Sequence, residues 1–244
     1  MHTFGIDVGG SGIKGAPVDT ATGELLRERE RIATPQPSTP QAVVETVAEL
    51  LREVPPGRIG VTLPSVVVDG TACTAANIDP SWVGTDVRAL LLDATGREAL
   101  VVNDADAAGA AEVRFGAARG VAGTVLVLTL GTGIGSALFR DGLLVPNTEL
   151  GHLELDGADA ETRASDAARK REDLSWEAWA ERVQRYLVHV DLLLRPDLVV
   201  LGGGVSKKAE QWLHLLDVRP PLVPAGLKNE AGIVGAALLA AGSA

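Results

Sequence analysis

The segment DVGGSGIKG, residues 7–15, contains a glycine-rich stretch at 9–12 that joins two runs of β-branched and apolar side chains. Residues 3–8 predict a strand, and residues 13–18 predict its antiparallel return across a short turn. The glycines at 9, 10 and 12 let backbone N–H groups of this turn approach an anion closely. The chain is therefore expected to open with a β-hairpin whose turn can bind phosphate, although a flexible hairpin turn without a ligand is the alternative.

The same order of strand, glycine turn and strand occurs again in the second half. Residues 124–130 form a strongly apolar run, GTGIG follows at 131–135, and a strand pattern resumes over 136–139. The segments GSGIKGAPVD, from Gly10, and GTGIGSALFR, from Gly131, can be aligned, and the offset between them is about half the chain length. A duplicated fold is predicted, and two such turns can hold one phosphate chain between them.

The rest of the chain alternates between strand and helix patterns, which is typical of an α/β protein. Short buried strands, each leading into polar residues, are predicted at 58–63 and 99–102, and a further strand at 198–201 leads into a third glycine run. Helical spacing of apolar residues predicts an amphipathic helix over 43–54, a long helix from the Ser175 cap to Pro196, and a last helix over about 230–241.

Composition limits the classes of function. The 244 residues are 46% hydrophobic, enough for one large domain or two small ones, and the net charge is −10. Such a surface repels phosphate polymers as a whole, so a polyanion must bind at a local basic patch. Cys73 is the single cysteine, which excludes a disulfide framework and suits a reducing compartment. No leader, membrane span or basic DNA-binding segment is recognised, so a cytoplasmic protein without membrane or nucleic-acid partners is expected.

Several polar residues are candidates for binding a phosphoryl donor. Asp7, at the end of the first strand, is a candidate to hold Mg²⁺ through water, and Lys14 offers a positive charge to the donor. A third glycine run, which includes Gly203 and Gly204, follows the strand at 198–201 and is placed at the start of the next helix. Lys207 and Lys208 come directly after it.

Asn103 and Asp104 follow the buried strand at 99–102, at the carboxyl edge where α/β sheets bind ligands. Asp104 is the candidate general base that accepts the proton of a sugar hydroxyl as it attacks phosphorus. In the competing interpretation Asp104 or Asp106 only caps the helix over 107–114. Further along, Glu149, His152 and Glu161 are groups of the kind that bind several sugar hydroxyls. Four histidines and one cysteine suggest no transition-metal site.

Five ordered motifs together resemble the ROK sugar kinases, and more closely their polyphosphate glucokinase branch. They are DVGGSGIKG, NDADAAGAAE, LTLGTGIGSALFRDG, TELGH and LGGGVS, and KREDLSWEAWAERV and LKNEAGIVGAAL are also similar to that branch. The resemblance covers nearly the whole chain. It implies two actin-like (ribonuclease H-like) α/β lobes with a central cleft, residues 1–105 and 106–244, with the last helix packing back on the first lobe. It also implies a homodimer and transfer of a phosphoryl group to the 6-hydroxyl of glucose.

The resemblance also assigns roles to single residues. Asp104 resembles the catalytic base, and the residues that resemble glucose ligands are Asn77, Asn103, Asp104, Glu149, His152 and Glu161. The region for the phosphate donor and Mg²⁺ comprises Asp7, Gly9, Gly10, Ser11, Gly12, Lys14, Gly131, Thr132, Gly133, Gly203, Gly204, Lys207 and Lys208. The zinc-binding cysteine cluster of the family is missing between His152 and Glu161, so no zinc is expected. Ser65 stands where close relatives are expected to carry glycine, and it would be strained if the position needed a positive φ.

The expected function is a glucokinase that uses polyphosphate as donor, with ATP as a further donor. The alternatives are a kinase that uses only ATP and, with the least support, a regulator that binds sugar without turnover. Candidates for a cationic polyphosphate track are Lys14, Arg114, Arg119, Arg169, Lys170, Arg171, Lys207 and Lys208, any of which can instead belong to a solvated surface. Regulators of this family carry an added helix-turn-helix, whereas here the first strand begins at about residue 3. Neither the donor preference, nor the acceptance of mannose or glucosamine, nor the polymer length follows from the sequence.

Overall fold

A computed structural model describes residues 2–76 and 78–242 of the chain. Two compact units follow from its internal contacts. Unit 1 comprises Met1–Ala111 together with Glu230–Ala244, and unit 2 comprises Glu112–Asn229. The sequence had placed the boundary at residue 105, and α3 (Asp104–Phe115) contains the division at residue 111.

Unit 1 is built on a five-stranded mixed sheet with the order β3-β2-β1-β4-β7. The predicted hairpin is β1 (His2–Gly9) and β2 (Gly12–Asp19), paired antiparallel from His2↔Asp19 to Gly9↔Gly12. β3 (Glu30–Ile32) extends the sheet beside β2, and β4 (Ile59–Leu63) and β7 (Ala99–Asn103) lie parallel to β1. The carboxyl ends of β1, β4 and β7 therefore meet at one edge, where α/β sheets bind ligands.

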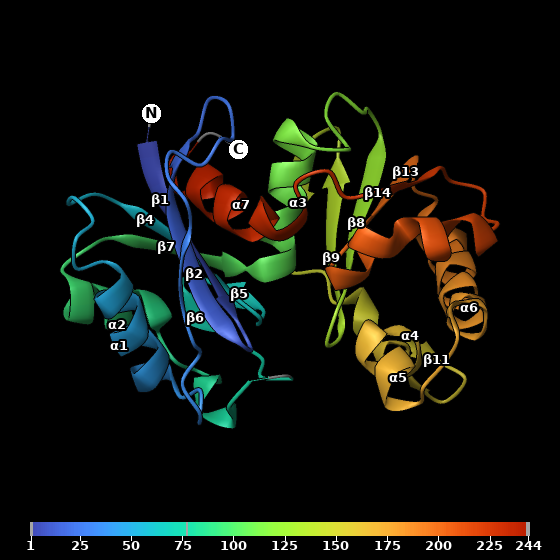
Figure 1. Cartoon of the computed structure of the whole chain (residues 1–244), viewed down its shortest axis with the longest axis horizontal. Coiled ribbons are helices and arrows are strands. Elements are labelled where there is room, and N and C mark those ends of the chain that lie inside the picture. The colour runs from blue at the N-terminus through green and yellow to red at the C-terminus, as the bar shows by residue number, and fades with distance from the viewer. Residues whose placement is uncertain (1, 77, 243–244) are drawn as a thin grey trace. The chain divides into compact units, whose positions relative to one another are not determined.

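Two helices cover one face of the first sheet and α7 covers the other (Figure 1). α1 (Pro40–Leu50) and α2 (Val87–Thr95) begin at Thr39 and Asp86, whose side chains accept hydrogen bonds from backbone N–H groups of the first turn. Two short strands, β5 (Val67–Val68) and β6 (Thr71–Ala72), and the 3-10 helix η1 (Pro80–Trp82) complete this side. One apolar cluster joins α1, α2 and the strands.

The last helix, α7 (Ala231–Ala240), is buried on nearly all sides and packs on β1 and β4. Helices that are apolar all round are found in protein interiors. Its backbone comes so close to the sheet that a side chain on Gly60 would collide with the carbonyl group of Ala236. Glycine in β4 is thus a condition for the last segment of the chain to complete the core of unit 1.

Unit 2 repeats the topology of unit 1. Its sheet has the order β10-β9-β8-β13-β14, in which β8–β9 and β9–β10 are antiparallel and β13 is parallel to β8 and β14. The strands are β8 (Thr124–Leu130), β9 (Ile134–Arg140), β10 (Leu143–Val145), β13 (Leu198–Gly202) and β14 (Leu222–Pro224). The predicted duplication and the α/β class are confirmed.

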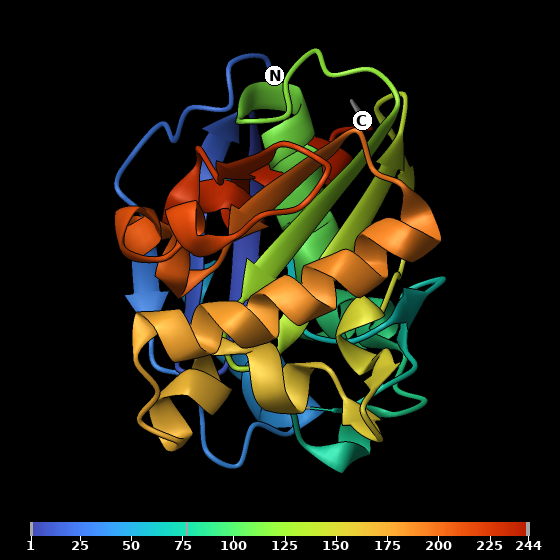
Figure 2. The ribbon, with the colours of Figure 1, turned by 90° about the vertical axis from the view of Figure 1, so that its right-hand side faces the viewer.

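The long helix α6 (Trp176–Leu194) crosses one face of this second sheet (Figure 2). Trp179, Val183, Tyr186, Leu187 and Val190 form its buried stripe and join the apolar cluster of β8 and β13. Between β10 and α6 lie η2 (Leu150–His152), β11 (Glu154–Leu155), β12 (Ala158–Asp159), α4 (Glu161–Ala164) and α5 (Asp166–Arg171). After β13 come η3 (Gly204–Gln211), η4 (Leu213–Leu215) and, beyond β14, η5 (Lys228–Glu230).

Most predicted elements are confirmed, and two differ. The helix expected over 43–54 is α1, which ends at Leu50, five residues before the two prolines. The helix expected after Gly204 is the 3-10 helix η3, which non-helical angles at Lys208 interrupt. Among the described residues, no helix has the length and apolarity needed to cross a membrane.

Candidate active site

The first glycine turn joins β1 to β2. It is bound by a cation of a neighbouring strand that sequence reasoning missed. Arg31, on the neighbouring strand β3, reaches across and donates from Nη2 to the backbone oxygen of Ser11 at 2.6 Å. Thr34 donates its hydroxyl to the oxygen of Gly9 on the other side of the turn. The signal for Arg31 was hidden because the pairing of β2 with β3 is not apparent from a three-residue strand.

Asp7 lies at the end of β1 and is held by two neighbours. Lys14 Nζ lies 3.2 Å from Oδ2, and the Thr62 hydroxyl donates to Oδ1 at 3.1 Å. The same hydroxyl accepts the backbone N–H of Val8, which fixes the side chain of Thr62. The Asp7 side chain remains 21% exposed. One accessible carboxylate suits Mg²⁺, which keeps most of its water and takes few protein ligands.

Asn103 and Asp104 lie where β7 ends and α3 begins. Asn103 Oδ1 accepts the backbone N–H groups of Ala105 and Asp106 at 2.8 and 3.0 Å, and its Nδ2 donates to the oxygen of Ser65 at 3.1 Å. Asn103 therefore caps α3, which corrects the interpretation that Asp104 or Asp106 does so. Asp104 is the first residue of the helix, and its carboxylate accepts the N–H of Ala105 at 2.8 Å. A helix N-terminus favours the charged form of such a carboxylate.

Ser65 is not strained, because its φ is not positive. Its hydroxyl lies 2.8 Å from the Thr74 oxygen and 2.9 Å from the Val66 oxygen, and the Thr74 hydroxyl accepts the N–H of Val66. Together with the bond from Asn103, these contacts hold the loop after β4 against the start of α3. The serine that replaces the expected glycine thus braces this loop.

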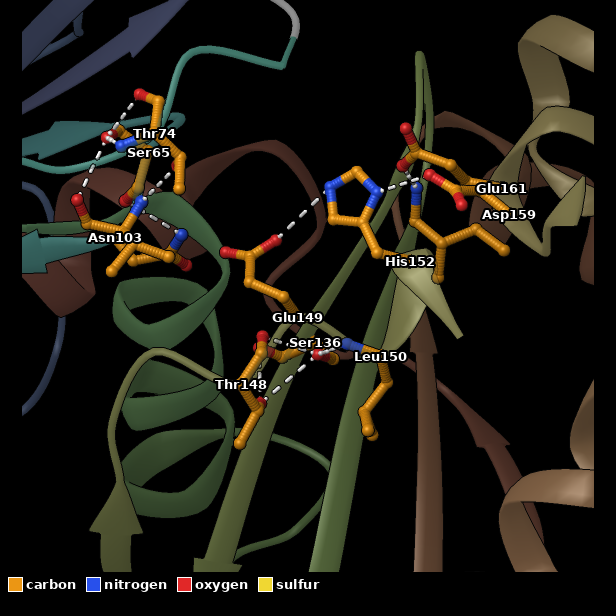
Figure 3. Close-up of polar contacts among 12 residues, drawn as sticks. Ser65, Thr74, Asn103, Ser136, Thr148, Glu149, Leu150, His152, Asp159 and Glu161 are labelled. Atoms are coloured by element: carbon orange, nitrogen blue, oxygen red, sulfur yellow. Dashed lines mark hydrogen bonds and ion pairs between the residues drawn. The ribbon is translucent and has the colours of Figure 1, made fainter. Parts of the chain in front are cut away.

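Unit 2 brings together Glu149, His152 and Glu161, the three residues predicted to bind sugar in that half (Figure 3). His152 Nδ1 lies 2.9 Å from Asp159 Oδ2, and its Nε2 lies 3.8 Å from Glu149 Oε2. Glu161 Oε2 accepts the N–H of Ile134 at 3.0 Å, which ties the carboxylate to the second glycine turn. Asp159, which the sequence did not single out, is the residue that orients the imidazole.

The electrostatics of this cluster follow from its charges and burial. The hydrogen bond to Asp159 raises the pKa of His152, partial burial opposes this, and the charges of Glu161 and Glu149 add to it. Burial raises the pKa of Glu149, against the effect of the His152 charge. The cluster therefore combines carboxylate acceptors with an imidazole, a set of groups suited to binding several hydroxyl groups.

Two further contacts position Glu149. The hydroxyl of Ser136 on β9 donates to the Thr148 oxygen at 2.7 Å and accepts the N–H of Leu150 at 3.0 Å, so it holds both neighbours of Glu149 (Figure 3). The hairpin of β11 and β12 follows, with Asp156 and Gly157 at positive φ in its turn. This hairpin lies between His152 and Glu161, the segment in which the zinc-binding cysteine cluster expected from the resemblance is missing.

The second and third glycine runs lie next to each other in unit 2. The N–H of Gly131 donates to the oxygen of Gly133, and the oxygen of Gly131 accepts the N–H of Ala167 in α5, both at 3.0 Å. Gly203, with φ of 83°, lies directly against the backbone of Leu130, where a side chain would collide. The two donor-binding runs predicted in this half thus form one backbone surface.

The candidate site residues divide between the two units. Unit 1 contains the donor candidates Asp7, Gly9, Gly10, Ser11, Gly12 and Lys14 and the sugar candidates Asn103 and Asp104. Unit 2 contains the sugar candidates Glu149, His152 and Glu161 and the donor candidates Gly131, Thr132, Gly133, Gly203, Gly204, Lys207 and Lys208. Asn77 lies outside the described residues. A pocket of about 200 Å³ in unit 1 adjoins the first glycine turn at Gly9 and Gly10.

Comparison with known proteins gives concordant matches. The sequence is 50% identical over 239 residues to polyphosphate glucokinase of Mycobacterium tuberculosis, covering 97% of this chain and 90% of that protein. The crystal structure of inorganic polyphosphate/ATP-glucomannokinase from Arthrobacter sp. strain KM matches with a TM-score of 0.96 and 53% identity, covering 100% of this chain and 99% of that one. A ROK family glucokinase from Streptomyces griseus, solved with glucose and AMPPNP, is 23% identical with a TM-score of 0.86 and covers 99% and 100% of the two chains, which supports the fold alone.

A match to a protein-family model shows the family of this chain. The ROK family model covers residues 3–165, which include both glycine turns, Asp104 and the acidic cluster of unit 2. The actin-like α/β class expected from the motifs agrees with the duplicated sheets and with these structural neighbours. This chain belongs to the ROK family.

Proposed function

We propose that this protein is a polyphosphate-dependent glucokinase, which transfers a phosphoryl group from inorganic polyphosphate to the 6-hydroxyl of glucose, with ATP as a second donor. The observation that carries the proposal is the 50% identity over 97% of the chain to a polyphosphate glucokinase. The similarity to the polyphosphate/ATP-glucomannokinase supports both donors. It leaves the acceptance of mannose to experiment.

Asp104 is the proposed general base. As the 6-hydroxyl oxygen attacks the terminal phosphorus, its proton passes to the Asp104 carboxylate, and the bond from phosphorus to the rest of the donor breaks. The cap at Asn103 and the N–H of Ala105 orient this carboxylate in unit 1. The carboxylate is thus held at the first residue of α3.

Glu149, His152 and Glu161 are proposed to bind the hydroxyl groups of glucose. Their own anchors, Ser136, Asp159 and the N–H of Ile134, hold them in place before the sugar binds. Preorganised acceptors of this kind orient a substrate at little entropic cost. Asn103 and Asn77 are the remaining proposed sugar contacts, with Asn103 acting also as the helix cap.

The glycine runs and their cations are proposed to bind the donor. Backbone N–H groups of the first turn at 9–12, and those of Thr132 and Gly133 in the second, would bind phosphate oxygens, and Lys14 and Arg31 supply positive charge in unit 1. Asp7 would hold Mg²⁺ through water, and the ion would neutralise charge on the transferred phosphoryl group.

A homodimer in the cytoplasm completes the proposal. Val188 and Leu192, apolar residues of α6 that are 50% and 70% exposed, support such an assembly.

The test is the production of glucose 6-phosphate by the purified protein with Mg²⁺ and glucose, comparing long-chain polyphosphate with ATP. Efficient turnover with polyphosphate is expected. Turnover with ATP alone would replace the proposal by an ATP-dependent glucokinase. No turnover with either donor, while glucose still binds, would identify a sugar-binding regulator instead.

A further inference from the structure

Three tryptophans in unit 2 form a connected array. The rings of Trp176 and Trp179 pack edge to face with centroids 5.7 Å apart, and those of Trp179 and Trp212 do so at 5.0 Å. Trp179 Nε1 lies 3.0 Å from the Ala164 oxygen and 3.2 Å from the Ser165 oxygen, where α4 passes into α5. Trp212 Nε1 donates to Val205 in η3 at 3.2 Å. The array thus fixes α5 and η3 relative to the start of α6.

Two cations lie over the outermost ring of this array. The Arg169 guanidinium carbon is 4.0 Å from the centroid of Trp176, and Lys208 Nζ is 6.0 Å from it. The Nε of Arg169 also donates to Oδ1 of the buried Asp166 at 3.0 Å. An arginine can stack through its plane and hydrogen-bond through its edge at the same time, and the Arg169 side chain keeps 18% of its surface exposed.

These cations are attached to the donor loops of the same unit. α5, which carries Arg169, is bonded to the second glycine turn through Ala167 and Gly131. η3, which carries Lys208, directly follows Gly203, and Gly203 lies against Leu130 just before that turn. Two elements that adjoin the candidate donor loops therefore each bring one cation to a single tryptophan.

Basic residues beside them in the sequence have other partners. Lys170 Nζ lies 2.6 Å from Asp166 Oδ2 and is 67% exposed. Arg171 binds the Thr162 oxygen at 2.7 Å and Glu172 at 3.0 Å. In contrast, the side chain of Lys208 makes neither a hydrogen bond nor an ion pair with any residue that the structure describes. Of the three adjacent basic residues, Arg169 therefore both stacks on Trp176 and pairs with the buried Asp166, whereas Lys170 and Arg171 are more exposed and are held by ion pairs alone or with a backbone oxygen.

We propose that Arg169 and Lys208, positioned by Trp176, form a subsite for the phosphates of a polyphosphate chain that lie beyond the transferred group. This rests on the proposed function. With a net charge of −10, the protein needs a local pair of cations to hold a polyanion. A nucleotide has no phosphate beyond its third, so the subsite favours the longer polymer.

The experiment compares Arg169→Gln, Lys208→Gln and the double variant with wild type, using long-chain polyphosphate and tripolyphosphate as donors. Because a hydrogen bond between charged groups is lost, each single variant is expected to raise the KM for the long polymer about tenfold. The KM for tripolyphosphate is expected to rise by less than about threefold, because that donor ends before the subsite. Arg140→Gln is the control, because this exposed arginine of unit 2 lies at the end of β9 away from the glycine turn, and it should leave both values unchanged.

Equilibrium binding of long-chain polyphosphate, measured without glucose at two salt concentrations, gives a readout independent of turnover. Cations that bind a polyanion release its counterions, so the affinity of the Lys208→Gln variant should depend less steeply on salt than that of wild type. Arg169→Gln also removes a partner of the buried Asp166, and the thermal midpoint of each variant therefore controls for folding.

Equal rises in KM for both donors, or values like those of wild type for both, would overturn the subsite. Turnover and binding of polyphosphate by the wild-type protein decide the proposed function separately. If the wild-type protein neither uses nor binds polyphosphate, the proposed function fails. If it does both and the two variants match it, only the subsite is wrong.

Discussion

The two sheets share one strand order but are filled in different ways. In unit 1, α7 packs its backbone against Gly60 of β4, so helix and sheet are in direct backbone contact. In unit 2, Trp179 and Tyr186 of α6 fill the space above Leu126 and Leu128 with large side chains. The same topology can therefore be packed in two ways. A helix with small side chains can pack closely on glycines of the sheet, or a helix with large side chains can lie farther from it, provided that the volume between the layers is filled.

The two glycine turns differ in where their positive charge comes from. Aligning the two hairpins places Lys14 of the first opposite Gly135 of the second, so unit 2 has no lysine within its turn. Its cations come from later segments, α5 and η3. The duplicated hairpin therefore supplies the backbone donors in both halves, whereas the charge arrives by separate routes.

The largest expected effect tests the division of chemistry between the units. Asp104→Asn removes the proposed base from unit 1 and should lower kcat by about 10³-fold while leaving glucose affinity near wild type. Glucose 6-phosphate formation and equilibrium glucose binding measure the two quantities. Turnover close to wild type in a folded variant would show that Asp104 is not the base.

The packing contrast predicts a large difference in stability. Gly60→Ala places a methyl group against the Ala236 carbonyl and should lower the free energy of unfolding by about 3 kcal/mol. Gly202→Ala in β13 of unit 2 is the matched control, because its nearest neighbours would lie at 3.5 Å, an ordinary contact. Urea unfolding measures both, and equal losses would contradict the close-packed arrangement of α7.

Removing an acceptor from unit 2 should change binding and not chemistry. Glu149→Gln is expected to raise the KM for glucose about tenfold, because one hydrogen bond to a charged acceptor is lost. Glu154→Gln, on the exposed hairpin strand of the same segment, serves as control and should change nothing. A fall in kcat with an unchanged KM would instead place Glu149 in the chemical step.

The smallest effect concerns the imidazole of His152. Asp159→Asn removes the hydrogen bond that raises its pKa, so the pKa should fall toward the ordinary value. A raised pKa in the folded state stabilises the protein below the unfolded value, about 6.5, and this contribution is lost as pH rises through the folded value. NMR titration of the imidazole measures the change, with His189 as internal reference, and an unchanged pKa would exclude Asp159 as the cause.

Much of the fold was predictable because its signals are local. Glycine turns between apolar runs predicted both hairpins, buried runs ending in polar residues predicted β4 and β7, and the apolar run before the third glycine run predicted β13. Ser175 predicted the start of α6. Short segments such as β3 and the hairpin of β11 and β12 escaped notice, since two or three residues carry no periodicity.

The candidate site was predictable only in its residue types. Carboxylates, glycines and histidine in ordered motifs indicated the chemistry, but the partner of each side chain depends on distant segments. Arg31 reaches the first turn from β3, and Asn103 rather than Asp104 caps α3. These contacts follow from strand pairing and loop geometry, which a single sequence does not display.

The sequence by itself determined the duplicated hairpins, the α/β class and the kinds of groups available for phosphate and sugar, because turns, strands and helix caps depend on neighbouring residues. Only the tertiary structure decided which cations remain available to a ligand. Arg169, Lys170 and Arg171 are adjacent in the chain, yet only Arg169 stacks on a tryptophan. Arg169 and Lys170 share the carboxylate of Asp166, and Arg171 pairs with Glu172. Long charged side chains choose partners by reach and burial, and these are set only when the units fold.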